Sequence, residues 1–207
     1  DKFEKEAFDL ADAVTAGSKE SYEHYSKLGT KVSHIPNAID IESLSSEADT
    51  RYEKQIIFAG RLSKEKGILT VLETAQDLPE DIHLIIIGKG PEEKAVIEHT
   101  KKFTNTHFLG YQPKEKTIPL IRGSKLLIQP SFVEGISTTL LESMSCKTPI
   151  IASNIGGNKE LLIHNKTGVL IEPGNPKELL KEILNILDDD NLLDDITKAA
   201  YEEVHNY

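Results

Sequence analysis

Residues 129–142 read Gln129-Pro130-Ser131-Phe132-Val133-Glu134-Gly135-Ile136-Ser137-Thr138-Thr139-Leu140-Leu141-Glu142 and join an expected strand to an expected helix. The apolar run at 126–128 predicts a buried strand, and the proline that follows it predicts a turn. Residues 138–146 then place leucine and methionine at helical spacing. The stretch therefore predicts a strand, a glycine-containing loop and the start of a helix.

The expected helix start is suited to a phosphate group. Ser137, Thr138 and Thr139 place free backbone N–H groups and hydroxyls there, at the positive end of the helix dipole. Glu134 lies just before this start, and Glu142 lies about one turn inside the helix. Because carboxylates repel phosphate, we expect each acid to contact a neutral hydroxyl group on one side of the phosphates.

The composition excludes several classes of protein. Of the 207 residues, 38% are hydrophobic and 28% are charged, which is typical of a soluble protein. The formal net charge of −10 argues against nucleic acid as a partner, so an anionic ligand must be held by a local group of cations. The single cysteine, Cys146, rules out an internal disulfide and favours a reducing, cytoplasmic compartment. No apolar run reaches transmembrane length.

From residue 55 onward, apolar strands alternate with helical patterns, which predicts an α/β fold with a parallel sheet and helices on both faces. In such folds ligands bind at the carboxyl ends of the strands. Glycines follow several of these ends, as at Gly60, Gly88, Gly110 and Gly135. The expected strands are 55–59, 83–87, 106–109, 125–129, 149–153 and 167–171.

Both ends of the chain differ from this regular region. Residues 1–40 predict a helix, a short strand, a second helix and a second strand, and 41–54 are polar enough for a linker. Residues 191–207 predict a final helix. Because the chain begins with Asp1 rather than methionine, we expect it to be a piece of a longer protein.

Cations and glycine loops follow the first two regular strands. Arg61 and Lys66 could hold a diphosphate, or could be solvated surface cations beside a turn. The loops Gly88-Lys89-Gly90-Pro91 and Gly110-Tyr111-Gln112-Pro113 are weak motifs, which fit either tight turns or backbone contacts to a base.

The two acids also invite comparison with glycosidases, whose carboxyl groups lie about 5–9.5 Å apart. A wholly helical path from Glu134 to Glu142 would span roughly 12 Å, which suits the two ends of an extended ligand better. A solvent-exposed or capping role is the alternative for either acid. No metal site is expected, because the histidines lack ligand spacing and Asp188-Asp189-Asp190 reads as a helix end.

These motifs together resemble the donor-binding, C-terminal half of retaining GT-B glycosyltransferases, the family-four group known as glycosyl transferases group 1. The likeness runs over about 55–190, and the pair of glutamates eight residues apart is its most specific part. Lys147 and Lys159 depart from the pattern, since they stand where glycine and proline are common. The motifs are Gly60-Arg61, Lys66-Gly67, Gly88-Lys89-Gly90-Pro91, Phe108-Leu109-Gly110-Tyr111, Pro130-Ser131, Glu134-Gly135, Glu142, Ser153, Gly156-Gly157, Glu160 and Thr167-Gly168.

The resemblance implies one Rossmann-like half of a GT-B fold and a UDP- or GDP-sugar as substrate, with no further cofactor. Arg61 and Lys66 would hold the diphosphate, Glu142 the ribose and Glu134 the donor sugar, with Glu134, Arg61 and Lys66 as the catalytic group. The nucleotide-binding set would be Gly60, Gly88, Lys89, Gly90, Tyr111, Gln112, Gly135, Ile136, Ser137, Thr138, Thr139 and Glu142.

The same resemblance divides the chain. Residues 1–40 would be the tail of an N-terminal acceptor domain with its hinge, and 191–207 would be the helix that crosses back to it. An acceptor saccharide or lipid, and any peripheral membrane contact, would belong to that missing half, so this chain alone would be inactive. The alternatives are a non-catalytic nucleotide-sugar binding subunit, or an epimerase or phosphorylase of the same architecture.

Overall fold

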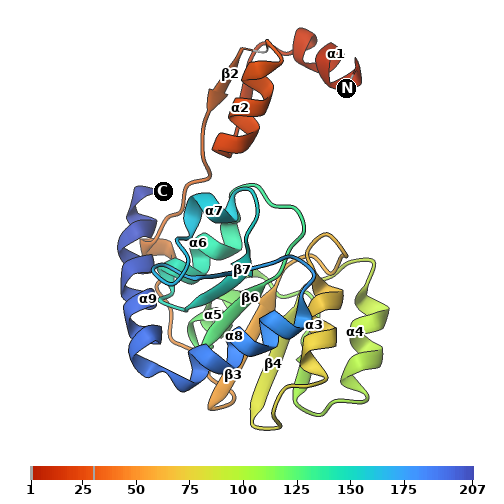
Figure 1. Cartoon of the computed structure of the whole chain (residues 1–207), viewed down its shortest axis with the longest axis vertical. Helices are drawn as coiled ribbons and strands as arrows, with labels where there is room; N and C mark the ends of the chain where they lie inside the picture. Colours follow the sequence, from red (N-terminus) through yellow and green to blue (C-terminus); the bar gives the residue numbers. More distant parts are fainter. Residues whose placement is uncertain (1, 30) are drawn as a thin grey trace.

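The computed structural model describes residues 2–29 and 31–207, and its centre is a six-stranded parallel sheet (Figure 1). The strand order is β5-β4-β3-β6-β7-β8, and every neighbouring pair is parallel. This confirms the predicted α/β fold, with strand boundaries shifted by one or two residues. The strands are β3 (Lys54–Ala59), β4 (Ile82–Ile87), β5 (Thr106–Phe108), β6 (Leu126–Gln129), β7 (Ile150–Ser153) and β8 (Val169–Ile171).

Helices cover both faces of the sheet because side chains alternate along each strand. In β3, Ile56 and Phe58 belong to one buried cluster and Ile57 to the other. The first cluster packs against α3 (Ile68–Ala75), α4 (Glu93–Thr100) and α8 (Pro176–Asp188). The second packs against α5 (Lys114–Arg122), α6 (Thr138–Ser145), α7 (Asn158–Leu161) and the end of α9 (Asp190–Glu203).

The strand order places a switch point between β3 and β6. The chain passes from β3 outward to β4 and β5, then returns to the other side of β3 with β6. The helices that follow β3 and β6 therefore lie on opposite faces of the sheet, and folds of this kind bind ligands at the carboxyl ends of two such strands. The loop after Gly60 and the loop 130–137, which the sequence singled out, both lie at this point.

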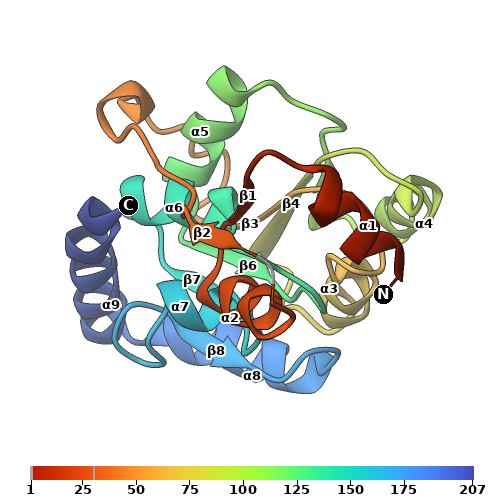
Figure 2. The same cartoon turned by 90° about the horizontal axis from the view of Figure 1, so that it is seen from above.

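A small unit lies over the carboxyl edge of the sheet (Figures 1 and 2). It contains α1 (Lys2–Leu10), β1 (Val14–Ala16), α2 (Lys19–Lys27) and β2 (Val32–His34), with β1 and β2 paired in parallel. The Glu160 carboxylate of α7 accepts hydrogen bonds from the amides of Lys19, at 2.9 Å, and Glu20, at 3.2 Å. Glu160, on α7, thus caps the first turn of α2.

Replacing Glu160 with alanine is expected to loosen α2 without unfolding the sheet. The change removes the acceptor for two first-turn amides, and a lost cap costs about 1 kcal/mol. A loss of about 1 kcal/mol corresponds to a factor of about five, so hydrogen exchange at the amides of Lys19 and Glu20 should be about fivefold faster. Lys159→Ala, an exposed change on the same helix, is the control. Equal exchange in both variants would show that the cap has no effect.

The polar segment 41–54 is docked rather than extended as a free linker. It contains a short 3₁₀ helix, η1 (Glu42–Leu44), and Leu44 is buried in the second cluster. The Leu44 carbonyl accepts a hydrogen bond from Arg122 at 3.1 Å, and Thr50 donates to the Gly123 carbonyl at 3.1 Å. Ile41 and Tyr52 also pack against this cluster, and the Asp49 amide donates to the Pro119 carbonyl at 2.8 Å, so the segment is held although its composition is polar.

Lys147, just after α6, lies in the left-handed region with φ 58°. Its amide donates to the Met144 carbonyl at 3.1 Å, and its ammonium lies 4.4 Å from the centroid of the Tyr201 ring on α9. The resemblance places glycine here, and this conformation explains why glycine suits the position. The cation–π contact offsets part of the strain.

We expect Lys147→Ala to be the less stable of two replacements at this position. Alanine keeps the left-handed strain and loses the contact with Tyr201, whereas glycine removes the strain. The free energy of unfolding of Lys147→Gly should be about 1 kcal/mol higher than that of Lys147→Ala. Urea unfolding of both variants measures the difference, and equal stabilities would contradict it.

No helix in the described part of the chain is both long enough and apolar enough to cross a bilayer.

Candidate functional site

The loops that leave β3 and β6 are locked together. The Gly67 backbone is left-handed, and a Cβ at this position would collide with the Pro130 carbonyl. The Phe132 amide also donates to the Glu65 carbonyl at 2.7 Å. Only glycine permits this approach, and it brings Lys66 beside Glu134.

The Glu134 side chain is buried, and one of its two carboxylate oxygens is hydrogen-bonded to three side chains. Its Oε1 accepts hydrogen bonds from Lys66 Nζ at 2.6 Å, Gln129 Nε2 at 2.7 Å and Ser131 Oγ at 2.8 Å. Only 6% of its side chain is exposed, against 34% for Lys66. The ion pair offsets the loss of hydration that burial of the carboxylate entails. The expectation from the sequence put these two residues on different parts of a ligand, whereas here they are in contact.

Helix α6 begins at Thr138, with Ser137 as its N-cap. The Ser137 hydroxyl accepts from the Leu140 amide at 3.4 Å and from Gln129 Nε2 at 2.9 Å, so it is committed to the cap. The amides of Thr138 and Thr139 precede the first intrahelical bond and point out of the helix end. These amides, rather than the Ser137 side chain, are therefore the free donors at the helix start where the sequence predicts an anion site.

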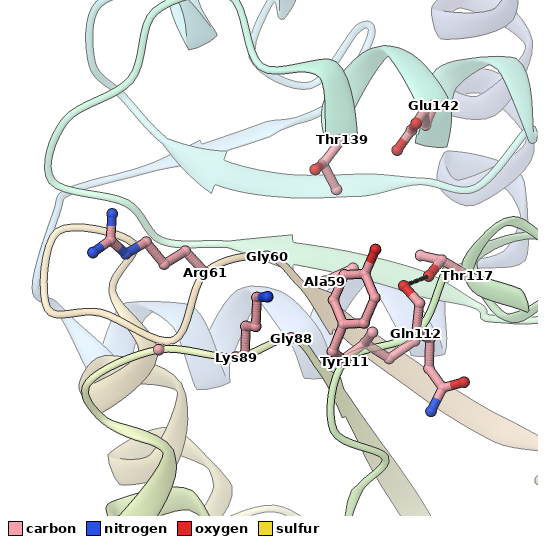
Figure 3. A pocket seen from close by; sticks show the side chains of 12 residues that line it. Ala59, Gly60, Arg61, Gly88, Lys89, Tyr111, Gln112, Thr117, Thr139 and Glu142 are labelled. Carbon is pink, nitrogen blue, oxygen red and sulfur yellow. Dashed lines mark hydrogen bonds between the residues drawn. The ribbon is translucent and has the colours of Figure 1, made fainter. Parts of the chain in front are cut away.

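Two adjoining cavities meet at this helix start. The larger has a volume of about 670 Å³ and the smaller about 180 Å³, and both are lined by Ala59, Gly60 and Thr139. Glu142 lines the larger cavity and Glu134 the smaller. In Figure 3, Thr139 and Glu142 lie on one side of the larger cavity, across from Lys89 and Tyr111. The two acids are thus placed on either side of the helix start.

Among the described residues, the Glu142 carboxylate has fewer hydrogen-bond and ion-pair partners than the Glu134 carboxylate. Its side chain is 17% exposed, and Lys114 Nζ lies 3.6 Å from its Oε1. Burial raises the pKa of the Glu142 carboxyl, and the nearby Lys114 ammonium opposes that rise. The carboxylate has given up most of its water, and its lone pairs are available to donors in the cavity.

The loops after β4 and β5 form the far wall of the larger cavity. Gly88 and Gly90 approach the backbone of Gly60 and Leu62 so closely that a Cβ on either would collide with it. Lys89 Nζ lies 5.0 Å from the centroid of the Tyr111 ring, which is 65% exposed. A flat aromatic face with a cation beside it is a surface on which a base can stack.

The cavities bring together most of the residues that the sequence nominated. The larger is lined by Gly60, Arg61, Gly88, Lys89, Gly90, Tyr111, Gln112, Thr139 and Glu142. The smaller is lined by Gly60, Lys66, Glu134, Ile136, Ser137, Thr138 and Thr139. Gly135 lines neither cavity.

Two of the nominated residues line a cavity but have side chains that also contact other parts of the protein. Ile136 is 7% exposed and packs into the second buried cluster. Gln112 donates its amide to the Leu109 carbonyl at 2.6 Å.

Sequence reasoning missed several residues of the site. Gln129 and Ser131 hold the Glu134 carboxylate, and Asn37 lines the smaller cavity while donating to the Ile136 carbonyl at 2.6 Å. Gln129 carried a signal, because a polar residue that ends an otherwise apolar strand requires a buried partner. Within residues 6–29 and 31–207, no group of three or more His, Cys, Asp or Glu side chains is arranged to hold a metal ion.

The family model described as Glycosyl transferases group 1 matches residues 42–203. A 2-deoxystreptamine N-acetyl-D-glucosaminyltransferase from Niallia circulans is 26% identical over 204 residues, which cover 89% of this chain and 52% of the relative. A phosphatidyl-myo-inositol mannosyltransferase from Mycobacterium leprae is 26% identical over 189 residues, which cover 87% of this chain and 50% of the relative. The chain spans about half the length of these curated relatives.

Solved structures share the fold. HepE from Anabaena, in complex with UDP and glucose, matches with a TM-score of 0.85 at 23% identity, over 97% of this chain and 60% of that one. The C-terminal domain of LpcC, a glycosyl transferase group 1 family protein from Francisella tularensis, matches with a TM-score of 0.69 at 21% identity. That match covers 82% of this chain and 97% of the LpcC domain.

Proposed function

The chain belongs to the glycosyl transferases group 1 family, and on that premise we propose that it binds a nucleotide-diphosphate sugar as the donor for retaining sugar transfer. One observation carries the proposal: Glu142 and Glu134 line two adjoining cavities that meet at the start of α6. A nucleoside fits the larger cavity, a hexose fits the smaller, and the diphosphate between them lies at the helix start.

Each part of the donor has its own partners in this arrangement. The base stacks on Tyr111, the ribose hydroxyls donate to Glu142, and the sugar hydroxyls donate to Glu134. The amides of Thr138 and Thr139 bind the diphosphate together with Arg61. When the bond to the sugar breaks, negative charge grows on the leaving diphosphate, and these fixed donors stabilise it.

Lys66 completes this set through its ion pair with Glu134. Lys66 lines the smaller cavity together with Glu134 and with Thr138 and Thr139 at the helix start. Lys66 therefore neutralises Glu134 in the free protein and contributes charge to the leaving group during transfer.

The activities and ligands named for the relatives support this assignment. HepE was solved with UDP and glucose, and two curated relatives are named as an N-acetylglucosaminyltransferase and a mannosyltransferase. A UDP- or GDP-sugar is thus the proposed donor, with no metal or further cofactor. The acceptor, a saccharide or a lipid, is proposed to bind on a partner domain that faces the carboxyl edge of the sheet.

A thermal-shift panel of UDP-, GDP- and ADP-sugars tests the proposal. A ligand at about a hundred times its Kd stabilises the folded state by roughly 2.7 kcal/mol. For a chain of this length that corresponds to about 5–10 °C in Tm. We expect a UDP- or GDP-sugar to give such a shift and free glucose to give none. A panel in which no sugar nucleotide raises Tm at millimolar concentration would refute the proposal.

Replacing both Arg61 and Lys66 with alanine is expected to weaken a nucleoside diphosphate far more than the bare nucleoside. Charge-assisted hydrogen bonds contribute roughly 1.5–3 kcal/mol each, and the nucleoside makes none of them with these cations. Calorimetry with UDP and uridine measures the two losses, with the exposed Lys64→Ala as the control. Equal losses for both ligands would place the diphosphate elsewhere.

A further inference from the structure

The Glu142 carboxylate is the less satisfied of the two acids at the site. Glu134 accepts three hydrogen bonds from side chains, whereas Lys114 is the one ion-pair partner of Glu142 within residues 6–29 and 31–207. Burial of this side chain, which is 17% exposed, raises the pKa of the Glu142 carboxyl, and the Lys114 ammonium 3.6 Å away lowers it. Whether it stays an acceptor therefore depends on that cation.

Lys114 is held where its ammonium can act on Glu142. It is the first residue of α5, directly after Pro113, and it is 53% exposed. Ile118 and Ile121, one and two turns further along α5, are buried in the second cluster and fix the helix against the sheet. The same loop carries Tyr111 into the larger cavity, so Lys114 is tied to that wall of the site.

We infer that Lys114 is a positioning residue: its ammonium holds the Glu142 carboxylate ionised and directed at the larger cavity, where it accepts the ribose hydroxyls. The inference rests on the proposed function and adds a residue to it. Lys114 itself lines neither of the two cavities, so it acts through Glu142 rather than on the ligand.

The other ionisable groups near Glu142 do not replace Lys114. Cys146 lies one turn further along α6, and burial raises the pKa of its thiol to about 11, so it is neutral. The Arg122 guanidinium acts on the Cys146 thiol and donates to the Leu44 carbonyl at 3.1 Å. Glu115, next to Lys114, is exposed and carries the wrong sign.

The expected consequence is a change in how nucleotide affinity depends on pH. Lys114 lowers the pKa of Glu142, so replacing Lys114 with methionine raises that pKa. Ribose hydroxyls donate to the ionised carboxylate, so affinity is full above the pKa of Glu142 and is lost as the pH falls through it. In Lys114→Met the loss therefore begins at a higher pH than in the parent chain.

Calorimetric titration with UDP between pH 5 and pH 8 tests this. At pH 8 we expect Lys114→Met to bind within about twofold of the parent, since Glu142 is ionised in both. At pH 5 it should bind about two- to fivefold more weakly, the range that half-exposed ion pairs contribute. Lys116→Met, an exposed lysine on the same helix, is the matched control and should follow the parent at every pH.

Two further measurements separate the explanations. With 2′,3′-dideoxyuridine diphosphate, which lacks the hydroxyls, the difference between Lys114→Met and the parent should vanish. An equal loss at all pH values for both ligands would mean that Lys114 touches the nucleotide directly, and would overturn the inference.

NMR titration of the Glu142 side-chain carboxyl in the free chain needs no ligand. We expect its midpoint to rise in Lys114→Met, and an unchanged midpoint would refute the positioning role. A raised midpoint in a chain that binds no nucleotide would support the positioning of Glu142 while refuting the proposed function.

Discussion

Glu142→Ala is expected to weaken the nucleoside monophosphate, the diphosphate and the sugar nucleotide alike, by about ten- to a hundredfold each. The three ligands share the ribose, and Glu142 lines the cavity proposed for the nucleoside. Within residues 6–29 and 31–207 its one ion-pair partner is Lys114, at 3.6 Å, so we expect the ribose hydroxyls to supply further hydrogen bonds to the carboxylate. Calorimetry with UMP, UDP and a UDP-sugar measures the three losses.

A control variant separates the role of Glu142 in binding from a general effect of charge. Glu115 is an exposed acid at the start of α5, and Glu115→Ala removes the same charge outside the cavity. It should bind all three ligands as the parent does. If Glu115→Ala matched Glu142→Ala, the effect would be one of net charge, and the ribose assignment would be wrong.

Glu134→Ala is expected to weaken only the intact sugar nucleotide, by about ten- to a hundredfold. Glu134 lines the smaller cavity, which is the one proposed for the donor sugar. The variant also frees Lys66 from an ion pair of 2.6 Å, so UDP should bind as well as in the parent or more tightly. Titration of the same three ligands gives the comparison.

The packing around Glu134 requires its own control. Gln129 and Ser131 both donate to its carboxylate, and alanine leaves those donors without their acceptor. Glu134→Gln keeps an oxygen for them and removes the charge, so it should preserve Tm and still lose part of the affinity for the sugar nucleotide. If Glu134→Gln bound the sugar nucleotide as the parent does, the loss in Glu134→Ala would come from the loop.

Much of the fold could be predicted because its strands are short apolar runs, each followed within three residues by a glycine or a proline. The apolar run 126–128 before Pro130 lies in β6, and the Ser137 hydroxyl accepts the hydrogen bond that caps α6. These are local signals, so one sequence is enough to read them. The order of the strands in the sheet was not predicted, because it depends on how the βα units pack together rather than on any local signal.

The contacts within the site could not be predicted in the same way. Lys66 and Glu134 are 68 residues apart in the chain, and their pairing depends on how closely Gly67 approaches Pro130. The burial of Ile136 and the contact between Lys114 and Glu142 depend on how α5 and α6 pack on the sheet. Residue type and spacing show which groups reach the carboxyl edge but not which of them meet.

The assignment of Glu142 and Glu134 to opposite ends of the donor is tested most directly by a ratio of two dissociation constants, the Kd of UDP divided by the Kd of the UDP-sugar. If the thermal-shift panel selects guanine, GDP and the GDP-sugar take their place. The ratio isolates what the sugar adds, because the nucleotide part cancels. Glu142→Ala should leave the ratio within about twofold of the parent value, and Glu134→Ala should lower it by about tenfold or more. An equal fall of the ratio in both variants would contradict the assignment of the two acids to opposite ends of one donor.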